Sequence, residues 1–440
     1  MKFFLKTLVL SCAMLAVAAQ AQDEVPSRVL LTNVSVWDGT SDKVSKDTDV
    51  LVEGNKIKKI GKNLDSEGAI VIDGKGGTVT PGLIDMHQHL TLNNGTAGGN
   101  KWDAYVQGAH ASRAAEYLLR SGFTTVRDIA GNSLGIKRAV NSGQLPGPRI
   151  YSSGPAIGPT GGHSDWGSWV DGPGAETYQQ KLQNTMVVDG ETEWLRAGRW
   201  NFRMGADFLK VMSGGGVASE FDPIDLNSPS LEEMKAAVDV AKTWNTYVAA
   251  HIFTDDAVQT ALRAGVMSIE HGFLIEKKET WQMMKKVGAW LSIQPLLDDE
   301  DALKFDNPYS QEKFSRVTAG TDNAYTTAKK MGINIAFGTD MLFDPVAAEK
   351  QGKMLSKLSR WFTPYEALRM ATSENARLLS LSGPRNDYRE GSLGVIEAGA
   401  YADVVLVDGN PLEDLDLVAD PHTNFVVIMK DGEIYKNTLE

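Results

Sequence analysis

The sequence predicts an α/β protein: a (β/α)8 TIM barrel with a small β-sandwich domain built from both ends of the chain. Between residues 81 and 380, strand-like segments alternate with helical ones, a rhythm typical of parallel strands joined by helices. Both ends of the chain are instead rich in strand-like segments. We therefore expect a barrel at 81–380, flanked by the two parts of the β domain at 22–80 and 381–440.

The first 21 residues have the character of an export signal. Two lysines precede an apolar stretch, and Ala19-Gln20-Ala21 fits a small-residue cleavage site. The apolar stretch is too short to span a bilayer, which needs about 20 residues. A lipoprotein anchored through Cys12 is the alternative, but Leu10 stands where a small residue is usual. We expect an exported protein, periplasmic or secreted, that is cleaved near Ala21.

Composition narrows the chemistry and the partners of the mature chain. The single cysteine lies within the signal, so any metal must be bound by nitrogen and oxygen ligands. Loss of the two signal lysines takes the formal net charge from −12 to −14, which argues against nucleic acid or an anionic membrane as partner. No later segment is long and apolar enough to predict a membrane span.

The two ends of the chain have the same strand-like character. β-Branched residues alternate with polar ones, and Asp-Gly or Glu-Gly pairs mark turns. The segments are VLLTNVSVWDG and DVLVEGNKIKKIG near the start, and ADVVLVDGNP and NFVVIMKDGEIYK near the end. We expect these segments to assemble into one domain.

Helices of the middle region begin at recognisable residues. Ser230 and Glu233 form a capping box, and Thr363, Pro364 and Glu366 are typical of another helix start. Eight strand candidates separate the predicted helices: LIDMHQH, FTTVRD, RIYSSG, DFLKVMS, YVAAHI, SIEHG, WLSIQP and IAFGTD. Eight such units predict a TIM barrel.

Chemically active side chains occur on or at the ends of these strands. His87 and His89 end the first one, and residues i and i+2 of a strand share a face, so both can reach one target. The full set is His87, His89, Lys210, His251, His271 and Asp340. Active sites of such barrels lie at the C-terminal ends of the strands, so we expect the six side chains to converge.

This set suits a metal site. A lone strand-end histidine is more often structural, but four histidines and a carboxylate together are ligands for zinc or a similar divalent ion. If two ions bind, this set compensates their charge poorly and a bridging anion is needed. The amine of Lys210 could supply one by reacting with carbon dioxide to give a carbamate; a lysine that merely forms an ion pair is the alternative.

The order of the motifs resembles the amidohydrolase superfamily. HQH, FLKVMSGGG, AAHIF, IEHG and FGTD follow one another as in its binuclear members, and PGLIDMH, GFTTVRD and ADVVLVDGNP also match. The resemblance covers nearly the whole mature chain. It implies two divalent ions, zinc first, with cobalt or manganese as alternatives.

The resemblance also implies a role for each side chain. His87, His89 and Asp340 bind the first ion, His251 and His271 bind the second, and carboxylated Lys210 bridges the two. A hydroxide between the ions attacks the substrate carbonyl. Asp340 has a second task, because it accepts the proton of that hydroxide and passes it to the leaving nitrogen.

His163 is a further catalytic candidate. It follows the third strand in the Gly-rich segment GPTGGHSDWGSW, where it could donate a hydrogen bond to the polarised carbonyl. The resemblance supports substrate contact; packing on Trp166 or Trp169 is the alternative. Both tryptophans and Met212 could instead line an apolar pocket for an aromatic substrate. Arg203, like His163, is a candidate for binding a substrate carboxylate.

Other motifs have a structural interpretation. His110, in a helical run, and His422, in the C-terminal β region, are expected to be structural. Arg127 and Asp128 either support the ligands or form an ion pair at the barrel end, and we favour the structural role. The glycines at 214–216 predict only a flexible loop.

The resemblance is strongest to the imidazolonepropionase-like branch, on the segments FLKVMSGGG and GPTGGH. That branch includes Xaa-Pro and Xaa-Arg dipeptidases, N-acyl amino acid carboxypeptidases and ochratoxin-hydrolysing enzymes. It implies hydrolysis of the amide bond of dipeptides or N-acyl-L-amino acids, ochratoxin A included. The expected partners are such a small-molecule or dipeptide substrate and further copies of the chain, up to an octamer.

Two other functions remain open. One keeps the site and changes the bond, to a cyclic amide, a lactone or a phosphotriester. The other is a non-catalytic metal- or ligand-binding protein, against which the retention of Asp340 argues. Neither a GxxxxGK[ST] phosphate loop nor a GxGxxG dinucleotide motif after a strand is present, so hydrolysis is favoured over transfer.

Overall fold

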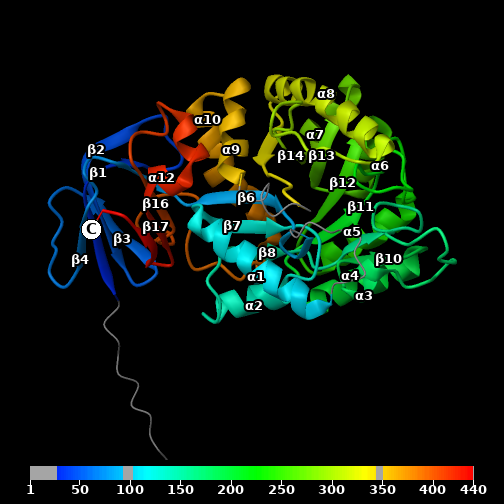
Figure 1. Cartoon of the computed structure of the whole chain (residues 1–440), viewed down its shortest axis with the longest axis horizontal. Coiled ribbons are helices and arrows are strands. Elements are labelled where there is room, and N and C mark those ends of the chain that lie inside the picture. Colours follow the sequence, from blue (N-terminus) through cyan, green and yellow to red (C-terminus); the bar gives the residue numbers. More distant parts are fainter. Residues whose placement is uncertain (1–26, 93–102, 343–349, 440) are drawn as a thin grey trace, which may run out of the picture.

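The computed structural model describes residues 27–92, 103–342 and 350–439. The predicted export signal and its cleavage site lie outside these residues. Strands from the two ends of the chain lie together at one end of the molecule, and helices surround the strands of the middle region at the other (Figure 1).

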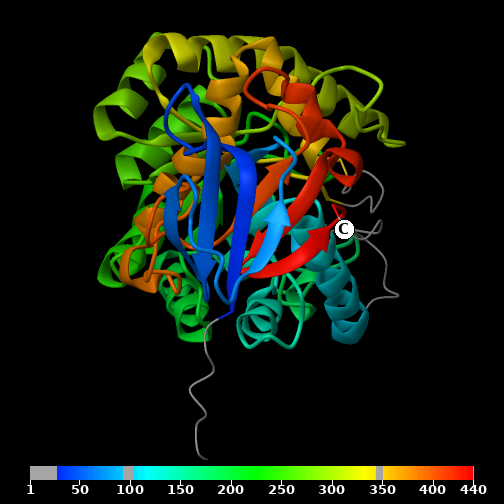
Figure 2. The same ribbon diagram turned by 90° about the vertical axis from the view of Figure 1, so that its left-hand side faces the viewer.

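Strands from both ends of the chain form one mixed sheet of eight. The N-terminal strands are β1 Arg28–Trp37, β2 Val44–Glu53, β3 Lys56–Gly61, β4 Ile70–Asp73 and β5 Thr78–Pro81. The C-terminal strands are β16 Val404–Val407, β17 Phe425–Lys430 and β18 Glu433–Asn437. The order is β18-β17-β16-β5-β1-β2-β3, with β4 paired to β1, and Figure 2 shows the two groups side by side. The eight strands from the two ends of the chain thus form one sheet. The predicted sandwich and the predicted domain boundaries stay predictions.

Each of the eight predicted segments of the middle region contains a strand. They are β6 Leu83–Gln88, β7 Phe123–Asp128, β8 Arg149–Ser152, β11 Leu209–Met212, β12 Val248–Thr254, β13 Ser268–Leu274, β14 Trp290–Ile293 and β15 Asn334–Phe337. All ladders between them are parallel. Two short strands that were not predicted, β9 Ala156–Gly158 and β10 Thr185–Val187, extend the larger sheet.

The strands belong to two sheets whose edges approach each other. One sheet is β6-β7-β8, and the other is β10-β9-β11-β12-β13-β14-β15. At one junction the Asp207 amide donates to the Ser152 carbonyl at 2.8 Å, and at the other the Asp340 amide donates to the His87 carbonyl at 2.8 Å. The fold is therefore α/β and TIM-barrel-like.

The α-helices lie between and outside the strands. They are α1 Ala104–Arg120, α2 Leu134–Asn141, α3 Tyr178–Lys181, α4 Glu191–Met204, α5 Leu231–Thr243, α6 Asp255–Ala264, α7 Lys278–Val287, α8 Pro308–Met331, α9 Gln351–Ser356, α10 Pro364–Arg369, α11 Asn375–Leu379 and α12 Pro421–Asn424. The predicted capping box at Ser230 and the predicted helix start at Thr363 are both confirmed, and Thr363 also forms a capping box with Glu366. In the part of the chain that the structure covers, no helix combines the length and the apolar character needed to cross a bilayer.

A buried ion pair joins the β sheet to the barrel. Arg149 at the start of β8 donates to both carboxylate oxygens of Asp403, at 2.9 and 3.2 Å, and also contacts Asp431 in the turn between β17 and β18. Tyr401 packs on the guanidinium, 3.8 Å from its ring centroid to the Arg149 Cζ. The Arg149–Asp403 pair that holds the two parts of the molecule together is thus almost fully buried.

Breaking this contact is expected to destabilise the whole chain. Arg149→Met leaves the buried carboxylate of Asp403 without its ion-pair partner, so the free energy of unfolding in urea should fall by about 3–5 kcal/mol. Arg360→Met is the matched control, because Arg360 pairs with Asp322 on the surface, and it should cost less than about 1 kcal/mol. Equal losses in the two variants would refute a joining role for Arg149.

Candidate functional site

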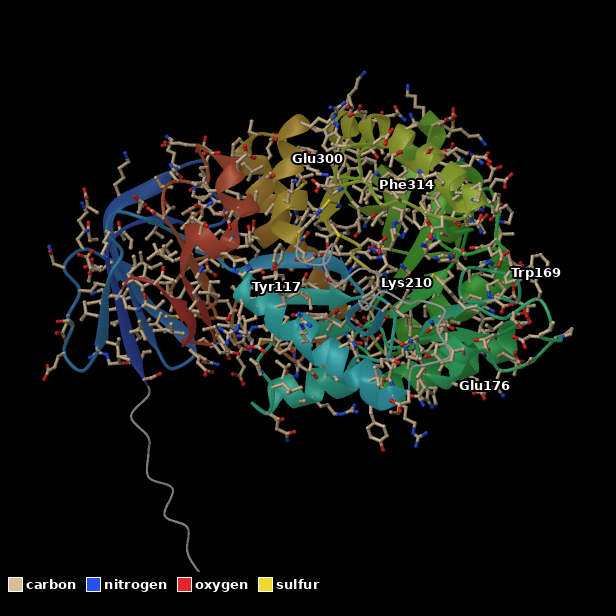
Figure 3. The ribbon with its side chains drawn as sticks, in the orientation of Figure 1. Tyr117, Trp169, Glu176, Lys210, Glu300 and Phe314 are labelled. Atoms are coloured by element: carbon tan, nitrogen blue, oxygen red, sulfur yellow. The ribbon has the colours of Figure 1, made fainter. Side chains whose placement is uncertain are left out.

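The six predicted side chains lie around one cavity of about 120 Å³. The residues that line it include His87, His89, His163, Lys210, His251, His271 and Asp340. They come from β6, β11, β12 and β13 and from the segments after β6, β9 and β15. Lys210, labelled in Figure 3, lies between the strands of the two sheets. The predicted convergence of these side chains therefore occurs in the structure.

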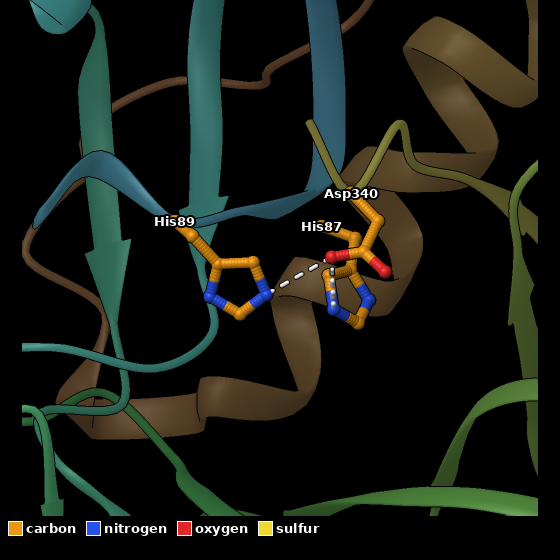
Figure 4. A group of neighbouring side chains, drawn as sticks. All are labelled: His87, His89 and Asp340. Carbon is orange, nitrogen blue, oxygen red and sulfur yellow. Dashed lines mark ion pairs between the residues drawn. The ribbon is translucent and has the colours of Figure 1, made fainter. Parts of the chain in front are cut away.

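His87, His89 and Asp340 form a compact group (Figure 4). The Asp340 Oδ1 lies 3.1 Å from His89 Nε2 and 3.5 Å from His87 Nε2. One ligand atom from each residue lies within 4.8 Å of the others. Burial alone raises the pKa of Asp340, but the adjacent histidines lower it well below its usual range. The three side chains have the spacing and charge to hold a metal ion together.

His251 and His271 continue this group toward the next strands. Their ring centroids are 4.5 Å apart, and the His271 ring is 4.8 Å from that of His87. Burial lowers the pKa of His87 to about 4 and the pKa of His271 to about 3, although Asp340 opposes both shifts. Both rings are therefore neutral at pH 7, the form in which histidine binds a metal.

In each of the four histidines, one ring nitrogen contacts an acceptor oxygen. The pairs are His87 Nδ1 with Glu270 Oε2 at 2.9 Å, His271 Nδ1 with Gln294 Oε1 at 2.8 Å, His251 Nε2 with the Gly215 carbonyl at 3.1 Å, and His89 Nδ1 with the Ala130 carbonyl at a long 3.5 Å. Since these oxygens accept, each such nitrogen donates, and the other ring nitrogen keeps its lone pair. This is the arrangement typical of metal-binding histidines.

Glu270 is a buried part of this arrangement that the sequence did not reveal. The Arg127 Nη2 donates to both Glu270 carboxylate oxygens, at 2.7 and 2.8 Å. Burial raises the pKa of Glu270, but Arg127 and His87 lower it far more, so the carboxylate is ionised. The favoured structural role of Arg127 is therefore wrong. Arg127 pairs with Glu270, which in turn contacts His87, so the alternative of support for the ligands describes it better.

The backbone at His271 explains why Glu270 was missed. Successive residues of a regular strand point to opposite faces, so a glutamate next to an inward histidine should face away from the site. His271 instead has φ +77° and Gly272 has φ +60°, which breaks the alternation and lets both side chains reach the interior. Asp340 has φ +55°, and such left-handed residues are uncommon outside glycine and often mark functional sites.

Asp85 fixes the junction between β6 and β15. One of its oxygens accepts from the amides of His87 and Thr339, at 2.9 and 3.1 Å. The other accepts from the hydroxyl of Thr339 at 2.6 Å and from Gln88 at 2.5 Å. This network holds the backbone next to His87 and Asp340 in register, and sequence analysis did not single it out.

Lys210 is almost fully buried at the centre of the site, with 1% of its surface exposed. Burial lowers its pKa to about 8, although Glu270 and Asp340 act in the opposite direction. A lowered pKa increases the fraction of neutral amine at pH 7, and only the neutral amine is a nucleophile. The environment of Lys210 thus favours reaction of its amine.

Two of the glycines at 214–216, Gly215 and Gly216, are required by close packing, so the expectation of a merely flexible loop is wrong. A Cβ on Gly215 would lie 1.8 Å from the Pro223 carbonyl oxygen, and a Cβ on Gly216 would lie 1.8 Å from the His163 ring. The loop therefore presses directly against Pro223 and against His163.

His163 lies over the site and lines the cavity. Its ring stacks on that of His251, with centroids 4.2 Å apart and an interplanar angle of 19°. The Trp166 indole donates to the His163 carbonyl at 3.0 Å. His163 thus lies at the cavity and also makes the alternative contact with Trp166; its contact with a substrate stays a prediction.

The rest of the cavity wall is mainly apolar. Trp166 and Met212 line it as predicted, together with Phe253, Phe273, Leu296, Leu303, Phe305, Phe314 and Val317. Trp169 does not: it is 77% exposed and packs on Phe221 at the edge of the molecule (Figure 3). Arg203 lies exposed in the last turn of α4, and His110 and His422 lie on α1 and α12; none of the three lines this cavity.

The fold and the site define the class of this protein: it has a TIM-barrel-like α/β fold, and its reactive groups gather at the carboxyl ends of the strands, where such folds have their active sites. The chain belongs to the amidohydrolase family, whose sequence profile matches residues 78–437. Metal binding is typical of that family, and the His-His-Asp group described above is consistent with it.

Individual relatives narrow the reaction. Ochratoxinase from Aspergillus niger is 30% identical over 373 residues, which cover 81% of this chain and 75% of that protein. The crystal structure of a prolidase complexed with N-methylphosphonate-L-proline matches with a TM-score of 0.86 at 31% identity, over 94% of this chain and all of that one. A Xaa-Pro dipeptidase with bound methionine matches with a TM-score of 0.80 at 29% identity, over 93% and 100% of the two chains. The protein is a hydrolase that acts on amide or peptide carbon–nitrogen bonds.

Proposed function

We propose that this protein is a binuclear metal-dependent amidohydrolase that cleaves dipeptides or N-acyl-L-amino acids, ochratoxin A included. The observation that carries the proposal is the convergence of four histidines, Lys210 and Asp340 on one cavity. The similarity of this chain to ochratoxinase, to a prolidase and to a Xaa-Pro dipeptidase supports the proposed substrate class.

The donor set fits two divalent ions, with zinc as the first choice. His87, His89 and Asp340 would hold one ion and His251 and His271 the other, with a carboxylated Lys210 between them. The outward ring nitrogens already donate to acceptors, which leaves lone pairs for the metals. When bound, the ions supply a water of lowered pKa and a Lewis acid for the substrate carbonyl.

The protein side chains position the substrate and move protons. Asp340 accepts the proton of the attacking water and passes it to the leaving nitrogen, because an amine leaves poorly unless it is protonated. His163 lines the same cavity and directs a hydrogen bond toward the substrate carbonyl oxygen.

The cavity wall supports an apolar acyl group or side chain in the substrate. Four phenylalanines line it, Phe253, Phe273, Phe305 and Phe314, and an apolar wall with a few polar groups is typical of small-molecule sites. A substrate whose amide lies at Asp340 and whose aromatic group contacts these rings fits this distribution.

A hydrolysis panel tests the proposal. The metal-analysed mature protein is incubated with N-acyl amino acids, dipeptides and ochratoxin A, and amine release is followed. Turnover that tracks metal content and falls after chelation is expected. A fully metallated protein that cleaves none of these compounds but opens lactones, cyclic amides or phosphotriesters would contradict the substrate class, and one that cleaves nothing would indicate a binding protein.

Glu270 provides a sharper prediction about the metal ligands. In Glu270→Gln the fixed negative charge beside His87 is lost, so metal affinity or kcat should fall by about 10- to 100-fold. Metal affinity is measured by competition with a chelator. Because Arg127 also loses its counter-charge in this variant, the double variant Arg127→Met/Glu270→Gln serves as control for folding.

The outcome separates two roles of Glu270: support of His87 as a metal ligand, and stabilisation of the fold through its ion pair with Arg127. If the double variant folds as stably as the native chain and still binds metal weakly, Glu270 acts on His87. If both variants bind metal as the native protein does, the supporting role is refuted.

We also propose that the chain is exported, with cleavage near Ala21, and that it assembles into homo-oligomers of up to eight copies. Both follow from the sequence pattern and from the resemblance to oligomeric relatives. Amino-terminal sequencing of the protein recovered outside the cytoplasm and light scattering of the purified protein test them. An uncleaved amino terminus or a monomer would refute the respective proposal.

A further inference from the structure

Asp222 is a buried carboxylate that contacts His163 from a different loop. It lies in the segment that follows β11, with 1% of its surface exposed. Its Oδ2 lies 2.9 Å from His163 Nδ1 and accepts from the Gly216 amide at 2.6 Å. A carboxylate with so little access to water needs such donors, so the loop after β9 and the loop after β11 are joined at this atom.

A third segment holds the backbone around Asp222. The Lys313 ammonium on α8, itself 2% exposed, donates to the Ser219 carbonyl at 2.5 Å and lies 3.4 Å from the Asp222 carbonyl. The Ser219 hydroxyl lies 2.8 Å from His163 Nδ1. Asp222 is therefore fixed by a helix on one side and faces His163 on the other.

The ring of His163 is confined from several directions. It stacks on His251 at 4.2 Å, and the backbone of Gly216 presses against it so closely that no Cβ fits. Because Nδ1 is occupied by Asp222 and Ser219, Nε2 is the nitrogen left to act in the cavity that His163 lines. A histidine on a Gly-rich loop needs such supports to keep one orientation.

We propose that Asp222 is the positioning residue for His163: it binds Nδ1 and thereby directs Nε2 toward the substrate. The inference rests on the proposed function, in which His163 contacts the substrate carbonyl. Asp222 itself contacts no reacting atom, and all of its effect on the reaction passes through His163.

A double-mutant cycle on the metal-loaded enzyme tests this. The set is Asp222→Asn, His163→Ala, the double variant, and Asp225→Asn as the matched control, since Asp225 is an exposed aspartate of the same loop. We expect kcat to fall by about 10- to 100-fold in Asp222→Asn and by about 100-fold or more in His163→Ala, with KM and metal content within about threefold of native. The double variant should equal His163→Ala, and Asp225→Asn should equal native. Losses that multiply in the double variant would overturn the proposal.

A second measurement does not depend on activity, so it separates this inference from the proposed function. In protein labelled with nitrogen-15 at histidine, the Nδ1–H of His163 is identified as the hydrogen-bonded signal lost in His163→Ala. It should shift or disappear in Asp222→Asn and stay in Asp225→Asn. If the native enzyme cleaves no amide, the proposed function fails while this signal still decides the role of Asp222; an unchanged signal in Asp222→Asn overturns the inference.

Two further variants cover the case in which Asp222→Asn does not fold. Asp222→Glu keeps a carboxylate, and Ser219→Ala removes the other group next to Nδ1. We expect both variants to retain the Nδ1–H signal of His163 at a shifted position, with a smaller loss of kcat in Ser219→Ala than in Asp222→Glu. A greater loss in Ser219→Ala than in Asp222→Glu would assign the positioning to Ser219 and overturn the proposal.

Discussion

Asp340→Asn is expected to lower kcat by about 10²- to 10⁴-fold, the range typical of a lost general acid–base group. Asparagine has the same shape as aspartate, but its amide cannot accept a proton from the attacking water and pass it on. The carboxylate also lies within 3.1–3.5 Å of the ring nitrogens of His89 and His87, so metal content should fall as well. The measurement is kcat on the best substrate of the panel, with metal content determined on the same samples.

Excess zinc separates the two roles of Asp340. When the variant is saturated with zinc, its metal content returns to the native level. The loss of kcat that is due to missing proton transfer should persist. Asp322→Asn is the control, since Asp322 is an exposed carboxylate paired with Arg360. A metal-saturated Asp340→Asn enzyme with kcat within threefold of native would contradict the proton-transfer role.

Lys210→Met is expected to abolish binding of the second ion and to lower kcat by more than about 100-fold. This loss is greater than the roughly 10- to 100-fold typical of a residue that only hydrogen-bonds to a metal ligand. Methionine fills a similar buried volume but cannot form a carbamate, so the two ions lose their bridging anion. The measurement is metal content per chain, together with carbon-13 NMR after incubation with labelled bicarbonate. A carbamate signal should appear in the native protein and be absent from Lys210→Met.

A second buried lysine shows whether the carbamate signal belongs to Lys210. Lys137 is buried and donates to Asp207 at 2.8 Å, so its amine stays protonated. Lys137→Met should therefore keep the carbamate signal. A Lys210→Met enzyme that still binds two ions and turns over within threefold of native would refute the bridging role.

The strand-end residues could be predicted from the sequence because their positions follow from local rules. His87 and His89 share a strand face, and a barrel brings the carboxyl ends of its strands together, so each prediction needed only a strand assignment. The capping residues Ser230 and Thr363 were equally local. Each of these assignments depended only on residues close to each other in the sequence.

The supporting residues could not be predicted in the same way. Asp85, Asp222 and Glu270 contact residues from distant segments, and these contacts exist only after the strands and loops have assembled. Glu270 was hidden further by the left-handed backbone at His271, which no local rule anticipates. Gly215 and Gly216 give no side-chain signal, since their role is to leave room for the Pro223 carbonyl and for the imidazole of His163.

The pairing of β5 with β16 has a consequence for how the chain folds. Thr80 and Val405 lie opposite each other in the sheet although 325 positions separate them in the sequence. Contacts of such long range slow folding, because the loop entropy is lost before the contact forms. The sheet edge at β5, next to the strand that carries His87, therefore stays open until nearly the whole chain is available. A chain truncated before residue 404 would expose that edge to other molecules and should aggregate.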